Sequence, residues 1–272
     1  MKNSSEKRRF RRGIYVLPTL FTIGTIFCGF FAVTNALKGE YNLAAIAIGF
    51  AVVFDGLDGR IARMTNSCSE FGVQIDSLAD VVTFGLAPAI LAYLWGVRAV
   101  SVESPYSLHL QQLGWIVCFG FLVCGAMRLA RYNIQSAMPP PSGSGSEKPF
   151  VGMPIPAGAA LIAAAVHFSP DPPQHWIAGM LWIVLVGFLG FLMVSTLKYP
   201  SFKHVDLKSR QRFVNFVLLA MLVALIYFYS QVVLLLLAAG YAFSGLGSKA
   251  YGLVKHKPEG VLTAGKLRPD DT

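Results

Sequence analysis

Residues 55–80 read DGLDGRIARMTNSCSEFGVQIDSLAD, and this stretch joins two long apolar segments of the chain. The apolar segments cover residues 42–63 and 71–96, and each is long enough to cross a bilayer as a helix, which takes roughly 20 residues. The stretch carries four aspartates: Asp55, Asp58, Asp76 and Asp80. Carboxylates are costly inside a membrane, so their presence in such helices indicates a function.

The composition of the whole chain favours a membrane protein. Hydrophobic residues make up 54% of the 272 residues, charged residues only 14%, and the mean hydropathy is +0.56. Soluble domains carry about 25% charged residues. Apolar runs without strand-like alternation predict helices, and hence an all-α polytopic membrane protein. The expected segments are 14–37, 42–63, 71–96, 113–134, 153–168, 176–197, 213–229 and 231–248.

The basic residues predict the orientation of these segments. With an even number of spans, all but Lys38 and Arg98 of the 23 Lys and Arg residues fall on one side. The positive-inside rule makes that side cytoplasmic. Both termini and the acidic stretch then lie on the cytoplasmic side, and we expect the protein to lie in the inner membrane. The net charge of +9 then reflects topology and attraction to anionic lipid headgroups, and we expect no nucleic-acid partner. The first apolar run is too long for a signal peptide.

The spacing of the four aspartates predicts that they meet. On a helix, Asp55 and Asp58 lie about 60° apart, and Asp76 and Asp80 about 40° apart. In an antiparallel hairpin, residues at equal depth have a constant index sum, which pairs Asp55 with Asp80 and Asp58 with Asp76. We therefore expect the four carboxylates to converge near the cytoplasmic interface.

Clustered carboxylates without a nearby histidine or cysteine form a hard, all-oxygen ligand set. Such a set suits Mg²⁺ or Mn²⁺, and the number of ligands allows two ions. Two metal ions held by carboxylates suit in-line chemistry at phosphorus. Gly56, Gly59 and Ala62 leave a strip without large side chains along the same helix, where a nucleotide could approach the backbone. The alternative is that these small residues serve helix–helix packing.

The pattern D-x-x-D-G-x-x-A-R-x8-G-x-x-x-D-x-x-x-D, matched in full by residues 55–80, resembles the signature of the CDP-alcohol phosphatidyltransferase family. The resemblance implies a CDP-linked lipid donor, a divalent metal, a six-helix core and commonly a homodimer, so that the last two segments would be additions to the core. It assigns the metal to Asp55, Asp58, Asp76 and Asp80, and the role of catalytic base to Asp80. It assigns the CDP site to Gly59, Ala62, Arg63 and Gly72.

Other stretches resemble phosphatidylserine synthases of the integral-membrane type, which implies CDP-diacylglycerol and serine as substrates. They are Ser69–Gly72, Asp76–Asp80, Phe84–Ala89, Arg128–Asn133 and Phe150–Ala157. Where that family often has Pro-Asn, this chain has Pro18-Thr19, which leaves one polar contact of the site in doubt.

The residues predicted for the acceptor site lie on the third and fourth apolar segments. Arg128 and Arg131 lie three residues apart on one helix side, and either could hold a carboxylate through a guanidinium fork. Asn133 and Ser77 could add polar contacts. Both arginines could instead be ordinary positive-inside anchors. The acceptor could be glycerol 3-phosphate or inositol phosphate, and an alternative of another class is a divalent-cation transporter.

The chain divides into five expected regions. They are a basic cytoplasmic head (1–12), a six-helix catalytic membrane domain (13–197), a basic cytoplasmic loop (198–212), two additional transmembrane helices (213–249) and a disordered cytoplasmic tail (250–272). The five histidines are isolated, and we expect neither a catalytic nor a metal-binding role for them.

Overall fold

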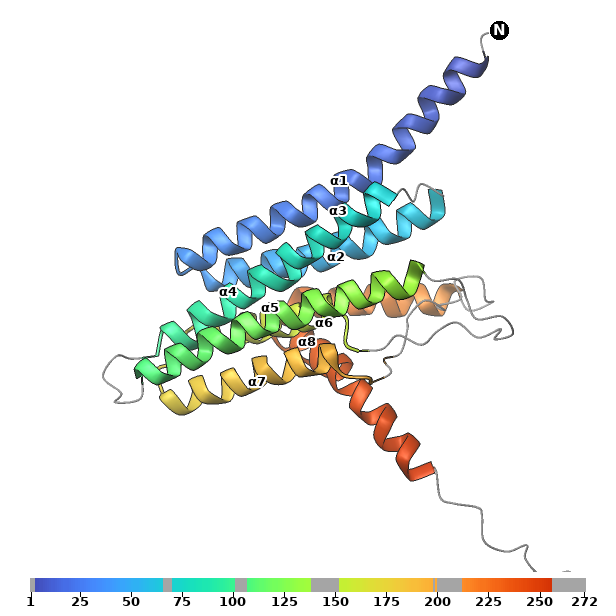
Figure 1. Cartoon of the computed structure of the whole chain (residues 1–272). Helices are drawn as coiled ribbons and strands as arrows, with labels where there is room; N and C mark the ends of the chain where they lie inside the picture. The colour runs from blue at the N-terminus through green and yellow to red at the C-terminus, as the bar shows by residue number, and fades with distance from the viewer. Residues whose placement is uncertain are drawn as a thin grey trace, which may run out of the picture.

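The computed structural model describes residues 3–65, 70–100, 107–137, 152–197, 199 and 212–255, and these residues form helices and short connections without any strand (Figure 1). The head's first two residues, the 138–149 loop, most of the 198–212 loop and the tail from residue 256 lie outside the described residues. The elements are α1 (Asn3–Leu37), α2 (Tyr41–Thr65), α3 (Glu70–Asp80), η1 (Val81–Leu86), α4 (Ala87–Tyr93), η2 (Leu94–Arg98), α5 (Ser107–Ala137), α6 (Ile155–Phe168), α7 (Trp176–Val194) and α8 (Arg212–Lys255).

The first two helices form a close antiparallel pair. Gly39 ends α1 with a positive φ of 85°, and the amide of Glu40 donates a 2.9 Å hydrogen bond to the carbonyl of Asn35. A residue with a Cβ rarely adopts this conformation, so glycine sets the turn. Small side chains fill the buried faces of the pair and let the backbones approach. They are Ala32, Ala36, Ala44, Ala45, Ala47 and Ala51.

The third expected segment is a continuous helical rod whose winding changes from α to π at two places. It runs through α3, the π-helix η1, α4 and the π-helix η2. Pro88 explains the first change, because it has no amide hydrogen to donate to the carbonyl of Phe84. The amide of Ala87 bonds instead to the carbonyl of Val82, five residues back. The rod therefore keeps most of its backbone hydrogen bonds by widening one turn immediately after Asp80.

The helices α5, α6 and α7 complete the core beside this rod. The indole of Trp182 on α7 donates a 2.9 Å hydrogen bond to the carbonyl of Ala92 and meets the ring of Trp95 edge-on, with centroids 4.7 Å apart. Gly152, with φ of 84°, turns the chain into α6, and its amide bonds to the carbonyl of Leu197 at 2.8 Å. These contacts fix α7 against both the rod and the start of α6.

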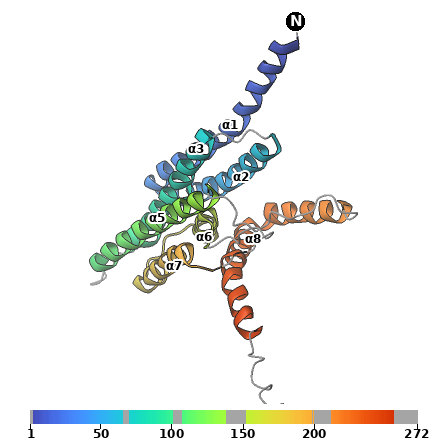
Figure 2. The same cartoon turned by 45° about the vertical axis from the view of Figure 1, so that its right-hand side comes forward.

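The helix α8 is bent at Tyr229, whose φ of −133° and ψ of 41° are not helical. The two halves leave the bend in different directions (Figure 2). The bend falls at the boundary that the sequence predicts between the segments 213–229 and 231–248, although the chain stays helical on either side of it. The helix packs mainly on α6, so it lies at the side of the bundle away from α1.

Six described stretches are long and apolar enough to cross a membrane, and they confirm the prediction of an all-α polytopic membrane protein. They are Thr19–Leu37, Tyr41–Ile61, Phe71–Arg98, Leu108–Ser136, Trp176–Val194 and Ala220–Gly245, with the shorter apolar helix α6 between the fourth and fifth. The last stretch passes through the bend at Tyr229 and covers parts of both expected C-terminal segments. Within the described part of the chain, α1 extends back to Asn3, beyond the expected start at residue 14.

Candidate metal and acceptor site

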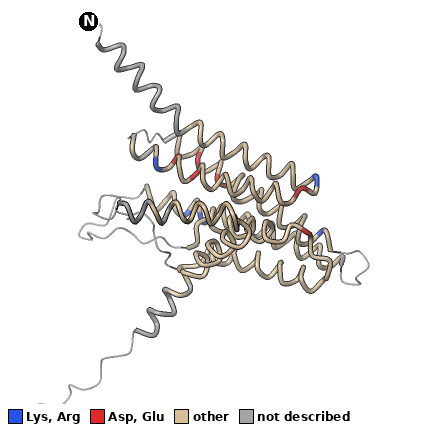
Figure 3. The backbone as a smooth tube through the Cα atoms, turned by 180° about the vertical axis from the view of Figure 1, so that it is seen from behind, with Lys and Arg blue, Asp and Glu red and all other residues tan. Residues whose placement is uncertain are grey.

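Three of the four aspartates converge between α2 and the rod that begins with α3. One carboxylate oxygen each from Asp55, Asp76 and Asp80 lies within 4.8 Å of the other two. The helix α3 packs here mainly against α1, and the carboxylates of α2 and α3 reach toward one another. Figure 3 shows the acidic positions grouped toward one end of these two helices. The predicted meeting of the two helices' acidic faces is therefore confirmed for these residues.

The fourth aspartate, Asp58, lies outside the 4.8 Å set, so the prediction that all four carboxylates meet as two level pairs is corrected for this residue. Asp58 is only 5% exposed, and its Oδ2 accepts a 3.3 Å hydrogen bond from Oγ1 of Thr22 on α1. Asp58 still interacts electrostatically with Asp76 and Asp55. One oxygen of Asp58 is therefore engaged by a hydroxyl of α1.

The group has the properties of a cation site. Oδ1 of Asp80 is buried and has no hydrogen-bond partner, although buried carboxylate oxygens are normally satisfied. Asp80 also interacts with the negative charges of Asp55, Asp76 and Asp58. Converging carboxylates repel one another unless a cation compensates them, and an all-oxygen donor set fits a hard divalent ion. The residues present therefore fit a hard divalent cation.

The small residues of α2 lie beside open space. A Cβ added to Gly56 or to Gly59 would meet no described atom within 4 Å. Packing between the described helices therefore does not explain these two glycines, and open space lies beside both positions. The side chains of Ala62 and Arg63, which belong to the same predicted nucleotide site, lie outside the described residues, and Gly72 is an exposed residue of α3.

Arg128 on α5 is a buried cation within electrostatic range of this group. It is 7% exposed, its Nε has no hydrogen-bond partner, and its guanidinium lies 5.6 Å from the centre of the Tyr132 ring. The guanidinium interacts electrostatically with Asp80. A positive-inside anchor would reach into solvent, so the burial of Arg128 argues against that alternative for this residue.

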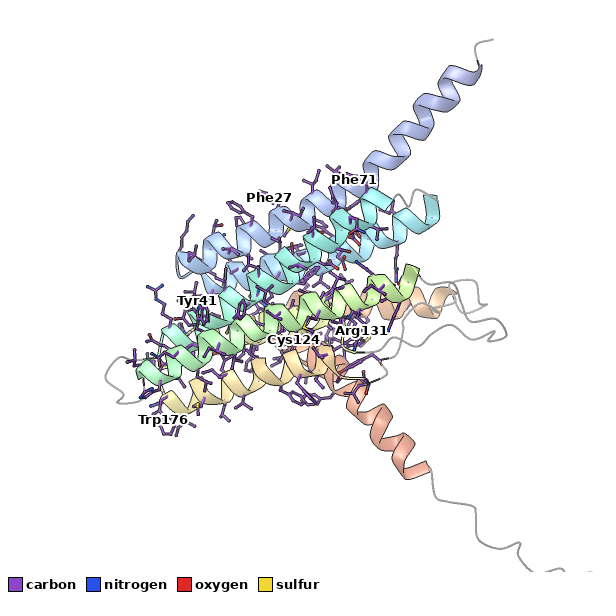
Figure 4. The ribbon with its side chains drawn as sticks, in the orientation of Figure 1. Phe27, Tyr41, Phe71, Cys124, Arg131 and Trp176 are labelled. Atoms are coloured by element: carbon purple, nitrogen blue, oxygen red, sulfur yellow. The ribbon has the colours of Figure 1, made fainter. Side chains whose placement is uncertain are left out.

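The other three predicted acceptor residues have partners within the protein. Arg131 Nη1 donates a 3.2 Å hydrogen bond to the carbonyl of Val194 at the end of α7. Asn133 Nδ2 donates a 2.8 Å hydrogen bond to Oγ of Ser77, which joins α5 to α3. The structure thus brings Asn133 and Ser77 together, whereas Arg131 anchors α7. Figure 4 shows Arg131 and Phe71 toward one end of the bundle and Tyr41 and Trp176 toward the other.

Sequence reasoning missed two polar side chains that support the site or the bundle. Thr22 carries the hydroxyl bound to Asp58, and only its helical spacing from Pro18-Thr19 could have pointed to it. His167 on α6 binds Asn42 Oδ1 through Nδ1 at 2.6 Å and Ser230 Oγ through Nε2 at 2.9 Å. It joins three helices, so the description of the histidines as isolated was wrong for this residue.

Comparison with known proteins agrees with this geometry. The sequence pattern of the CDP-alcohol phosphatidyltransferase family matches residues 15–189. A CDP-diacylglycerol–serine O-phosphatidyltransferase of Helicobacter pylori is 36% identical over 195 residues, which cover 71% of this chain and 75% of that protein. The proteins of the same name in Bacillus subtilis and Methanocaldococcus jannaschii are each 34% identical, over 69% and 71% of this chain and over 91% and 78% of their own lengths.

Proposed function

The chain belongs to the CDP-alcohol phosphatidyltransferase family, and on this basis we propose that it transfers the phosphatidyl group of CDP-diacylglycerol to L-serine, which forms phosphatidylserine and releases CMP. One observation carries the proposal: the carboxylates of Asp55, Asp76 and Asp80, which belong to the family signature, converge beside the open glycine strip of α2. The printed names of the relatives support serine as the acceptor. Nothing in the family membership favours the cation-transport alternative.

Asp55, Asp58, Asp76 and Asp80 would hold the metal, Mg²⁺ or Mn²⁺ and by ligand number two ions. When bound, the metal would neutralise charge on the pyrophosphate and on the departing CMP. Asp58 would contribute the oxygen that Thr22 leaves free. The unpartnered Oδ1 of Asp80 supports this assignment, since a cation would satisfy it.

The reaction we propose is a single displacement at the phosphorus that carries the lipid. The serine hydroxyl oxygen forms the new P–O bond, and the P–O bond to CMP breaks. Asp80 accepts the hydroxyl proton as general base. The strip at Gly56 and Gly59, with Ala62, Arg63 and Gly72, would take the CDP moiety, because a side chain there would occupy the space that the nucleotide needs.

Serine requires a site for its carboxylate close to the base. Arg128 meets this requirement, since it is buried, interacts with Asp80 and keeps Nε without a hydrogen-bond partner. A guanidinium binds a carboxylate through paired N–H donors. Ser77 and Asn133 would add polar contacts to the serine, and Arg131 would hold the end of α7 in place.

The multi-pass helical structure is consistent with an integral membrane enzyme, and we place it in the inner membrane with both termini and the acidic group on the cytoplasmic side. The bias of Lys and Arg toward one side supports this orientation. Anionic lipids would contact the basic segments, and a homodimer is the assembly that family membership favours. The five regions of the chain, from the head at 1–12 to the tail at 250–272, stay predictions.

A direct assay tests the function. Purified full-length protein in detergent receives CDP-diacylglycerol and Mn²⁺ or Mg²⁺, and CMP release is measured with serine, glycerol 3-phosphate or inositol phosphate. We expect metal-dependent release with serine alone. Release only with another acceptor would overturn serine while leaving the reaction class intact, and release with none of the three would overturn the proposed activity.

A further inference from the structure

The π-helix η1 begins at the residue after Asp80 and is tied to the first helix by one hydroxyl group. Thr83 is fully buried, at 0% exposed, and its Oγ1 donates a 3.0 Å hydrogen bond to the carbonyl of Thr25 on α1. That carbonyl belongs to a helix, where it would otherwise accept a hydrogen bond only from a backbone amide. The bond therefore connects two membrane helices that are 58 residues apart in sequence.

Gly29 gives Thr83 the space to approach. A Cβ on Gly29 would lie 2.7 Å from Oγ1 and 2.9 Å from Cα of Thr83, and the second distance involves backbone that cannot swing aside. Gly29 lies one turn after Thr25 on the same face of α1. Thr25 thus binds Thr83 through its carbonyl, and Gly29 leaves room for Thr83 because it has no side chain. We call these two α1 positions the seat of Thr83.

The seat acts on the site because Thr83 lies only three residues after Asp80. The helix is continuous between them, so a rotation or shift of η1 would move the Asp80 carboxylate relative to Asp55 on α2. Single π-helical turns are rare and occur often at functional sites, where neighbouring structure must maintain them. Here Pro88 at the start of α4 lacks the amide hydrogen that would otherwise bond to a carbonyl of η1. The hydrogen bond from Thr83 to Thr25 then fixes the orientation of η1.

We propose that Thr83 and Gly29 position the Asp80 carboxylate, so that the α1–η1 contact sets metal affinity and turnover without touching substrate. Thr83 is a positioning residue in this proposal. Its effect on metal affinity rests on the aspartate group alone, whereas its effect on turnover rests also on the proposed function. A hydroxyl that only completes the packing of the core would change stability and leave metal affinity unchanged.

The experiment compares purified full-length Thr83→Val and Thr83→Ser with the wild type. Valine has a similar shape without the hydroxyl, and serine retains it. Mn²⁺ binding is measured from the electron paramagnetic resonance signal of the free ion, and kcat and KM are measured by CMP release. Matched controls are Thr34→Val, which removes a 2.9 Å hydroxyl-to-carbonyl bond on the exposed face of α1, and Gly49→Ala, where a Cβ meets nothing within 4 Å.

We expect Thr83→Val to weaken Mn²⁺ binding and to lower kcat about 3- to 10-fold, the range that corresponds to one buried hydrogen bond. The KM for CDP-diacylglycerol should change less than about 2-fold, within the scatter expected when no substrate contact is lost. Thr83→Ser should restore both quantities, Gly29→Ala should reproduce the defect, and both controls should behave as wild type.

Wild-type Mn²⁺ affinity and kcat in Thr83→Val, with only a lower unfolding temperature, would overturn the proposal. If that variant does not fold, Thr83→Cys replaces it, since cysteine is a much weaker donor of similar size, and the same comparison with Thr83→Ser decides. Failure of the wild type to release CMP with serine would instead count against the proposed function, and the Mn²⁺ titrations would still test the seat.

Discussion

Oγ1 of Thr22 on α1 donates a 3.3 Å hydrogen bond to Oδ2 of Asp58 on α2, and the two residues are only 6% and 5% exposed. The bond lies within the close antiparallel pair of α1 and α2. It engages one of the two carboxylate oxygens of Asp58. The first helix therefore supports the acidic site at two places, at Thr22 and at the seat of Thr83.

Thr22→Val should lower kcat/KM about 5- to 10-fold, because the variant leaves one oxygen of a buried carboxylate without its donor and free to rotate. Thr22→Ser should keep most of the activity. CMP release with serine measures the effect, and Thr34→Val, on the same helix, serves as control. Equal activity of Thr22→Val and wild type would show that Asp58 is oriented without this bond.

Asp80→Asn should abolish most turnover and yet leave the metal-free protein at least as stable as the wild type. Loss of the base lowers the rate about 10²- to 10⁴-fold, and removal of one negative charge from the group relieves repulsion. CMP release gives the first quantity, and the unfolding temperature without added metal gives the second.

Added Mn²⁺ should then raise the unfolding temperature of the wild type more than that of Asp80→Asn, since ligand binding to the folded state stabilises it. Asp171→Asn, an exposed residue between α6 and α7, is the control. Near-normal turnover in Asp80→Asn would remove this residue as base. A metal response equal to that of the wild type would remove it as a ligand.

Arg128→Lys and Arg131→Lys should have different consequences, although the two residues are three positions apart. Arg128→Lys should raise the KM for serine about 10-fold or more, because an ammonium group cannot form the paired bonds of a guanidinium with a carboxylate. Arg131→Lys should instead lower the unfolding temperature, because it weakens the bond to the Val194 carbonyl. Serine-dependent kinetics and thermal unfolding separate the two, and the reverse pattern would assign the serine carboxylate to Arg131.

The sequence predicts the helical class and the meeting of Asp55, Asp76 and Asp80, because both follow from periodicity within two neighbouring segments. An index sum fixes depth in a hairpin. It does not fix the side-chain rotamer of Asp58, which depends on Thr22 from a third helix. The same limit applies to Arg131, whose partner, the Val194 carbonyl, lies 63 residues away.

The sequence alone does not predict the π-helix after Asp80, because this element also depends on contacts with a distant helix. Pro88 predicts the loss of one backbone hydrogen bond in the helix, but a kink, an inserted water or a wider turn could each accommodate this loss. The choice depends on the contact of Thr83 with Thr25 and Gly29, which only the packed structure brings together.

His167 joins α2, α6 and α8 through Asn42 and Ser230, and this bridge should stabilise the bundle without affecting the metal site. Asn42 Oδ1 only accepts hydrogen bonds, so Nδ1 of the neutral ring carries the proton and Nε2 accepts from the Ser230 hydroxyl. His167→Ala leaves both partners without their bonds and should lower the free energy of unfolding by about 1–3 kcal/mol.

Denaturant titration measures that loss, and Mn²⁺ affinity should stay at the wild-type value. His109→Ala, at an exposed position of α5, is the control. Asn42→Ala and Ser230→Ala, alone and combined with His167→Ala, complete double-mutant cycles that separate the two bonds. Because Ser230 directly follows the bend at Tyr229, a coupling between His167 and Ser230 would show that this bond helps to hold α8 against the core, and additive effects of the two substitutions would contradict that role.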